Sequence, residues 1–183
     1  RESVFTLGDQ VIQGEEYETP QYNGFGGWSL LCKEATWTGG WEAIQLEKGQ
    51  SLEDYFVGNT MKDRIAHFHL AFFDNDFVSE RTKKHIANPA KNSSAKRLNM
   101  YLRWMVRDND IDFGLWKSIH TSELKCPLDV HVQRAAFHFN LLTRTQQDWK
   151  AVEELSNNLL VLDPIDPIKY DLALIKWSER KMD

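Results

Sequence analysis

Two residues combine a reactive side chain with a place at the start of an expected helix, Lys96 and Asp129. Lys96 opens a helix after a tight turn, and Asp129 stands where an N-cap is expected before Val130. An unprotonated lysine amine can attack an electrophilic carbon to form a Schiff base, and a nearby carboxylate can stabilise positive charge or relay protons. The pair therefore indicates nucleophilic catalysis. The simpler interpretation is that Lys96 contacts a phosphate and Asp129 only caps its helix.

A strongly basic stretch surrounds Lys96. Residues 81–107 hold eight of the 22 Lys and Arg residues and none of the 27 Asp and Glu residues, in a chain of formal net charge −5. Such a concentration favours contact with the phosphates of a polyanion, most simply double-stranded DNA, although a solvated cationic face is the alternative. The residues predicted to bind DNA are Lys91, Asn92, Ser93, Ser94, Arg97, Arg103 and Arg107.

The elements that must position these residues are predicted to be helices. Apolar spacing indicates helices near 61–72, 95–107, 130–139, 148–160 and 167–178, with a helical turn capped by Ser51 and Asp54 and a short helix after Ser79. The side chains expected to face the core are Leu98, Tyr101, Leu102, Met105 and Val106 in the second of these helices and Trp149, Val152, Leu155 and Leu159 in the fourth. The segment from Asn88 to Ser94 supplies a helix stop, a tight hairpin and a new helix start. We therefore expect an all-α domain over residues 51–183 with a hairpin near 88–95.

Residues 1–50 are rich in glycine and give no clear periodicity, so we expect an irregular segment of turns and short helices. Because the chain begins with Arg1 rather than Met, we also expect a further segment upstream.

Composition narrows the class of protein. With 42% hydrophobic and 12% aromatic residues, the chain can bury a core without covalent staples. The two cysteines, Cys32 and Cys126, are far apart, which argues against disulfides, a cysteine metal knuckle or an iron–sulfur cluster and favours the cytoplasm.

No apolar run approaches the ~20 residues of a membrane span, so we predict no membrane association. We predict no metal site either, because no acidic residue completes a ligand spacing around His67, His69 and His85.

Three segments carry a resemblance to a known family: "NPAKNSSAKRLNMYLRWMVRDNDIDFGLWKSI", "CPLDVHVQRAAFHFNLL" and "DWKAVEELSNNLLVLDPIDPIKYDLAL". Over roughly residues 51–178 the chain resembles the domain-of-unknown-function 2400 family of bacterial proteins, most specifically in "KRLNMYLRWMVR" and "DPIDPIKYDLAL". That family is distantly similar to the helix–hairpin–helix DNA glycosylases, and the long segment between Lys96 and Asp129 is similar to the archaeal 8-oxoguanine glycosylase branch.

The resemblance implies a function and a set of site residues. In those glycosylases a hairpin ends in a catalytic lysine, and a Pro-hydrophobic-Asp-x-His-Val segment carries a catalytic aspartate; the matching positions are Lys96 and, in "PLDVHV", Asp129. It implies base excision with AP lyase activity on an oxidised purine such as 8-oxoguanine, in double-stranded DNA and without an obligate protein partner. It also implies that a monovalent cation can bind at the hairpin, with no other cofactor. Tyr170 and Asp171, which open the final helix, are the implied base-recognition residues.

Other interpretations stay open at this point. The chain can instead be a non-catalytic DNA-binding protein that keeps the hairpin, or an interaction module whose basic face meets an acidic protein. Trp104 and Trp116 are candidates for stacking on a base, with packing in the core as the alternative. Ser93 and Ser94 stand where glycosylase hairpins usually have glycine.

Overall fold

The computed structural model describes residues 3–7, 10–14, 51–73 and 86–180. Beyond residue 50 the described chain is helical, which confirms the predicted fold class. Its α-helices are α3 (Met61–Phe73), α4 (Lys96–Val106), α5 (Val130–His138), α6 (Trp149–Leu162) and α7 (Asp171–Glu179). Short 3-10 helices occupy Leu52–Tyr55, Pro89–Lys91, Thr121–Glu123 and Pro167–Tyr170. The helix expected after Ser79 lies outside the described residues.

The N-terminal segment differs from the prediction. Strand β1 (Ser3–Leu7) pairs antiparallel with β2 (Gln10–Gly14), and Leu7 lies opposite Gln10. The expectation of turns and short helices is therefore wrong for these two strands. The sequence signal for them is the β-branched content of both segments, on either side of the dipeptide Gly8-Asp9, which is typical of a hairpin connection. The other residues up to position 50 lie outside the described ranges.

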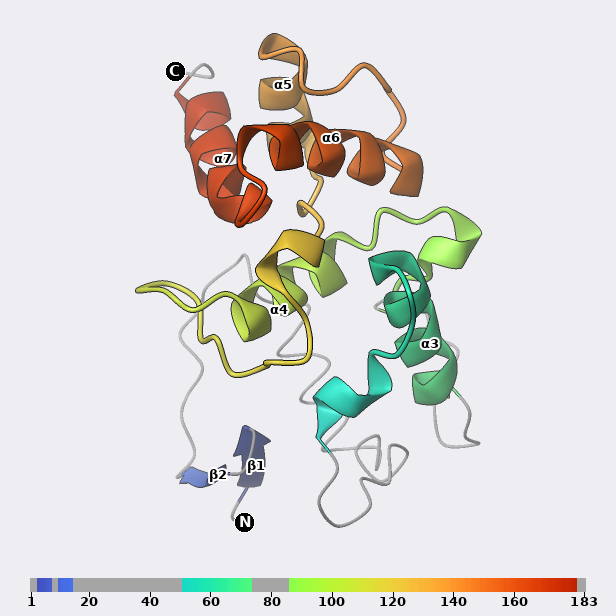
Figure 1. Ribbon diagram of the computed structural model, residues 1–183, viewed down its shortest axis with the longest axis vertical. Helices are drawn as coiled ribbons and strands as arrows, with labels where there is room; N and C mark the ends of the chain where they lie inside the picture. Colours follow the sequence, from blue (N-terminus) through green and yellow to red (C-terminus); the bar gives the residue numbers. More distant parts are fainter. Residues whose placement is uncertain (1–2, 8–9, 15–50, 74–85, 181–183) are drawn as a thin grey trace.

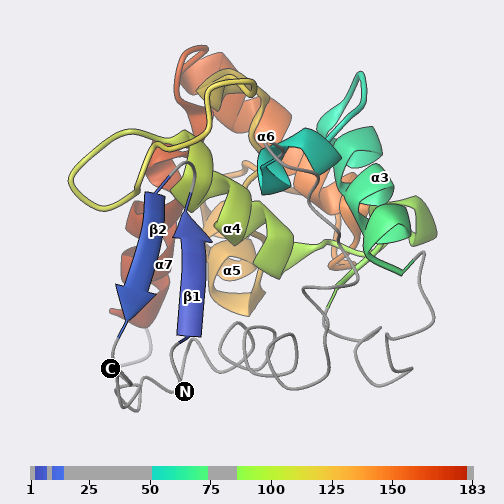
Figure 2. The same cartoon turned by 90° about the horizontal axis from the view of Figure 1, so that it is seen from below.

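Helix α4 occupies the middle of the helical part. Figures 1 and 2 show it between α3 and α7, and Figure 1 shows α5, α6 and α7 grouped together beyond it. Its apolar stripe is buried as predicted, at Leu98, Leu102, Met105 and Val106, and Tyr101 is half-buried. The site described below lies along this helix, which contributes Lys96, Met100, Arg103 and Trp104 to it.

Aspartate side chains cap the starts of α5 and α6. Asp129 is the N-cap of α5, as predicted, and accepts hydrogen bonds from the N–H groups of His131 and Val132. Asp148 is the N-cap of α6 and accepts from the N–H group of Ala151. Pro167 opens the 3-10 turn that leads into α7, where its missing N–H costs nothing. Helix α6 buries the four residues predicted to face inward, Trp149, Val152, Leu155 and Leu159. None of the helices in the described part of the chain is long and apolar enough to span a bilayer.

Candidate active site

The turn before α4 has the position of the predicted hairpin. The Asn88 side chain accepts from the Ala90 N–H at 2.8 Å, and the Asn92 N–H donates to the Pro89 carbonyl at 2.9 Å. The backbone then adopts left-handed conformations at Asn92, with φ 64°, and at Ala95, with φ 46°. Asparagine tolerates this region, whereas alanine is strained there. The chain therefore turns into α4 without the glycines that the resemblance led us to expect.

The hairpin is bound to the start of α6. Asn92 Nδ2 donates to Asp148 Oδ2 at 3.0 Å, and the Trp149 N–H donates to the Asn92 carbonyl at 3.2 Å. Asp148 also accepts from Arg144 Nε at 2.7 Å, and this hydrogen bond is the main reason why the pKa of Asp148 lies well below its usual range. These contacts fix the hairpin, and with it the first residue of α4, relative to a buried helix.

Carbonyl groups of the hairpin are engaged within the protein. Those of Asn88, Pro89, Asn92 and Ser94 all accept hydrogen bonds from N–H groups. The monovalent cation implied by the resemblance stays a prediction. In the described ranges, no three His, Cys, Asp or Glu side chains are grouped so that they could hold a metal ion.

Folding brings the two predicted catalytic residues into contact. Lys96 Nζ lies 2.9 Å from Asp129 Oδ2, and 41% of the Lys96 side chain and 20% of the Asp129 side chain are exposed. The other carboxylate oxygen, Oδ1, accepts from the N–H groups of His131 and Val132, both at 2.9 Å. Burial opposes ionisation of Asp129, but the hydrogen bonds from Val132 and Lys96 outweigh it and lower its pKa. Asp129 is therefore an anion held next to the amine.

The Lys96–Asp129 pair lines a pocket of about 620 Å³, a volume typical of small-molecule sites. The other polar side chains in its wall are Arg103 from α4 and Asp171 from α7. Its apolar lining consists of Met100, Trp104, Ile111, Phe113, Pro127, Leu172 and Ile175. The two tryptophans considered for stacking thus differ, because Trp104 lines the pocket whereas Trp116 is buried in the core.

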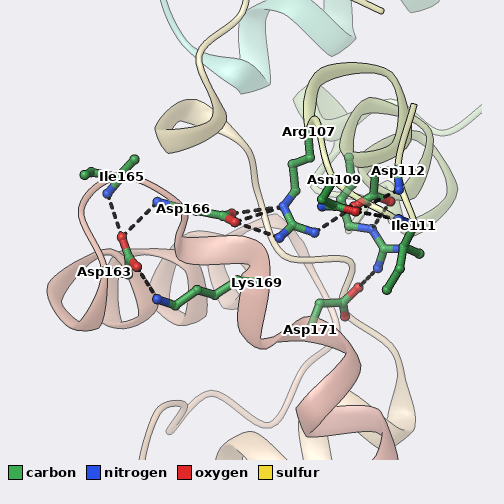
Figure 3. Close-up of polar contacts among 10 residues, drawn as sticks. Arg107, Asn109, Ile111, Asp112, Asp163, Ile165, Asp166, Lys169 and Asp171 are labelled. Carbon is green, nitrogen blue, oxygen red and sulfur yellow. Dashed lines mark hydrogen bonds and ion pairs between the residues drawn. The ribbon is translucent and has the colours of Figure 1, made fainter. Parts of the chain in front are cut away.

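A buried ion network supports one wall of this pocket (Figure 3). Arg103 binds Asp112, at 3.2 Å from Nε to Oδ1, and Asp171. Arg107 binds the second oxygen of Asp112 at 2.7 Å and holds Asp166 through Nε and Nη2, at 3.0 and 2.6 Å. We call these five residues the arginine–aspartate network. It joins α4 to the loop that follows it and to the start of α7.

The network contains two guanidinium groups and three carboxyl groups, so one carboxyl group lacks full compensation. Burial raises the pKa of Asp171 to about 6; Arg103 opposes this shift, and repulsion from Asp129 adds to it. Its Oδ2 is bound to Arg103, while its Oδ1 is buried with no hydrogen-bond partner. Asp171, which lines the pocket, thus retains an unused hydrogen-bond acceptor.

The network corrects the predicted DNA-binding surface. Arg103 and Arg107 were expected to face DNA, but their side chains are only 7% and 11% exposed and bind carboxylates of the same chain. Lys91, Asn92 and Arg97 are exposed, and Ser93 and Ser94 are half-buried. Three further cations of the basic stretch, Arg81, Lys83 and Lys84, lie outside the described residues, as does His85.

The two predicted base-recognition residues also differ. Asp171 lines the pocket, as expected, whereas Tyr170 is not among the lining residues. The Tyr170 ring packs against the core, and its centroid lies 5.2 Å from Lys169 Nζ. Nothing in the local sequence indicated that Ile111 and Phe113 line the pocket or that Asp112 binds two arginines. The sequence did contain one indication that Arg103 is buried. Asn99 and Arg103 lie four residues apart beside the apolar stripe of α4, and the structure buries both.

Comparison with known proteins gives one match. The model of a family described as "Protein of unknown function (DUF2400)" matches residues 41–180. No curated protein and no solved structure matches the chain.

The arginine–aspartate network leads to a prediction about stability. Asp112→Ala removes a fully buried carboxylate and leaves two arginines short of a partner. We expect the free energy of unfolding to fall by about 3 kcal/mol, the usual cost of breaking a buried ion pair from one side. Urea denaturation measures this change. Asp110→Ala, an exposed acid in the same loop, is the control and should change it by no more than about 0.5 kcal/mol. Equal effects of the two substitutions would contradict the role given to Asp112.

The carboxyl group of Asp171 leads to a prediction about pH. Its pKa is about 6 in the folded protein against an ordinary value of 3.8, so the folded state binds more protons between these values. The contribution of Asp171 to the free energy of unfolding is therefore fully present below about pH 4 and is lost as the pH rises through about 6. Relative to Asp171→Asn, the wild-type free energy of unfolding should fall by up to about 3 kcal/mol over this window. Urea denaturation at a series of pH values tests this, and parallel curves for the two proteins would refute it.

Proposed function

We propose that the chain, which belongs to the DUF2400 family, is a DNA glycosylase with AP lyase activity on an oxidised purine such as 8-oxoguanine. The observation that carries the proposal is the contact of 2.9 Å between Lys96 Nζ and Asp129 Oδ2 in the wall of an aromatic-lined pocket. A lysine nucleophile beside a carboxylate that stays ionised has the chemistry for attack on a sugar carbon that develops positive charge.

The reaction requires the damaged nucleotide to leave the duplex, because its C1′ atom cannot be reached within the base stack. Lys96 Nζ attacks C1′ as the glycosidic bond breaks. The electron pair of that bond leaves with the base, which takes up the proton released by the lysine. Asp129, whose pKa is lowered, stabilises the positive charge on the sugar. As the C1′–O4′ bond breaks, the ring oxygen takes up a proton from water and the lysine nitrogen becomes part of a protonated Schiff base. Water then removes a C2′ proton, the electron pair of that C–H bond forms a C2′–C3′ double bond, and the 3′ phosphate leaves with the electron pair of its bond to C3′, which cleaves the strand.

The hairpin is the proposed contact with the DNA backbone. Lys91 and Arg97 are exposed on either side of the turn that precedes Lys96. The N-cap of α4 is Ala95, which offers no side-chain acceptor to the N–H groups of the first turn. Such N–H groups, together with the helix dipole, attract phosphate. We therefore assign phosphate contact to Lys91, Asn92, Ser93, Ser94 and Arg97, and leave Arg103 and Arg107 out.

Asp171 is the proposed contact with the base. Asp171 lines the pocket, its Oδ1 has no hydrogen-bond partner, and purines carry N–H groups that can donate to a carboxylate. Trp104 lines the same pocket and offers an aromatic surface to a flipped base.

Lys96→Arg tests the nucleophile. Arginine keeps the positive charge but not the primary amine, so we expect borohydride to trap a covalent adduct of wild-type protein with damaged duplex DNA and none with the variant. The matched control is Lys150→Arg, at an exposed lysine of α6, which should still form the adduct. If the wild-type protein binds duplex DNA in a salt-dependent manner and forms no adduct, the lyase proposal fails and non-catalytic DNA binding takes its place.

Asp129→Asn tests the carboxylate. Asparagine caps a helix as well as aspartate does, so the thermal unfolding midpoint should change little. The negative charge next to Lys96 is lost, and we expect adduct formation to slow by about a hundredfold or more. The rate of adduct formation reports on the chemistry and the unfolding midpoint reports on the fold, so the two effects can be distinguished. A rate close to that of the wild type, with an unchanged midpoint, would show that Asp129 only caps its helix.

A further inference from the structure

The loop after α4 carries exposed apolar side chains at the edge of the pocket. Ile111 and Phe113 are 63% and 64% exposed, although both line the pocket that contains Lys96 and Asp129. Figures 1 and 2 show this loop projecting from the body of the molecule beyond the end of α4. Single exposed apolar side chains are common, but two large ones at the edge of the same pocket are typical of a binding surface.

The loop is held in a defined shape. Asn109 Oδ1 accepts from the N–H groups of Ile111 and Asp112 at 2.8 and 2.9 Å, and the Phe113 N–H donates to the Trp104 carbonyl at 2.8 Å. The carboxylate of Asp112 anchors the middle of the loop in the arginine–aspartate network. Gly114 has φ +60°, and a Cβ there would lie 2.6 Å from Asp108 Cβ. The exposed side chains are thus presented by a fixed backbone.

We propose that this loop is the wedge that opens the DNA duplex, with Ile111 and Phe113 entering the space left by the flipped nucleotide. This inference rests on the proposed glycosylase function. Proteins that kink or open DNA insert apolar side chains such as Phe, Leu and Ile between base steps, where these replace the lost stacking. Because both side chains line the pocket, they lie beside the path of a nucleotide that enters it.

The charges of the loop agree with contact through bases rather than through phosphates. Asp108 and Asp110 are exposed, and Asp108 is only weakly paired, at 3.6 Å from Lys117 Nζ. Phosphates would repel these acids, whereas the apolar side chains of Ile111 and Phe113, which follow them in the chain, gain from leaving water. The backbone contacts are made elsewhere, at the hairpin.

The test compares adduct formation on two abasic substrates, because opening is needed in a duplex and not in a single strand. Borohydride trapping is followed with an abasic site in duplex DNA and with the same strand alone. For Ile111→Ala, Phe113→Ala and the double variant, we expect the ratio of the duplex rate to the single-strand rate to fall by about tenfold or more. Phe113→Leu should restore most of the ratio, because leucine is also an effective wedge.

Ile165→Ala is the matched control, since Ile165 is 80% exposed but lies outside the pocket, and its ratio should equal that of the wild type. Loss of both rates in proportion would mean that Ile111 and Phe113 only form the pocket wall, and this result would overturn the wedge. An unaltered ratio in all the alanine variants would overturn it as well. Absence of trapping by the wild-type protein on both substrates would instead be a failure of the glycosylase proposal itself, and the wedge would fall with it.

Discussion

The guanidinium group of Arg103 is buried on α4 and bound by carboxylates from two other segments, Asp112 in the following loop and Asp171 at the start of α7. Asp171 lines the pocket itself, and Asp112 lies between the lining residues Ile111 and Phe113, so the shape of the pocket depends on this charge being matched. Apolar side chains would hold the same segments together without the cost of desolvating charges. We therefore attribute the network to the need to fix the polar groups of Arg103 and Asp171 in the pocket wall, rather than to stability as such.

The side chain of Asp129 has two roles, one in capping α5 and one in positioning Lys96. Its Oδ1 satisfies the first turn of α5, and its Oδ2 holds the amine of Lys96. The position of the carboxylate is thereby set by a helix end, which is more rigid than a surface loop. Lys96 is positioned in a similar way, at the first residue of α4 and directly after a hairpin that is bound to Asp148. Both groups of the proposed reaction therefore derive their geometry from helix starts.

Local patterns in the sequence were sufficient for the α-helices described beyond residue 50 and for the cap of α5. The spacing of Trp149, Val152, Leu155 and Leu159 predicted the buried face of α6, and Asp129 was predicted to cap α5. The same patterns proposed Lys96 and Asp129 but could not establish their contact, which depends on the packing of α4 against the start of α5.

The error about Arg103 and Arg107 has a physical cause that no local pattern contains. The carboxylates that neutralise them come from beyond the basic stretch, at Asp112, Asp166 and Asp171, so a count of charges along the sequence treats the arginines as free. The exposure of Ile111 and Phe113 was equally hidden. Apolar letters in a sequence normally indicate burial, and only the fold shows that this loop leaves them in water.

The left-handed backbone at Ala95 restricts what evolution can place next to Lys96. A φ of 46° disfavours any residue with a branched or bulky Cβ, and 1% exposure leaves no room for a longer side chain. Alanine and glycine are the residues that satisfy both limits, and glycine would also relieve strain of about 1 kcal/mol. Mutational drift at this position is accordingly confined to an exchange between the two smallest amino acids.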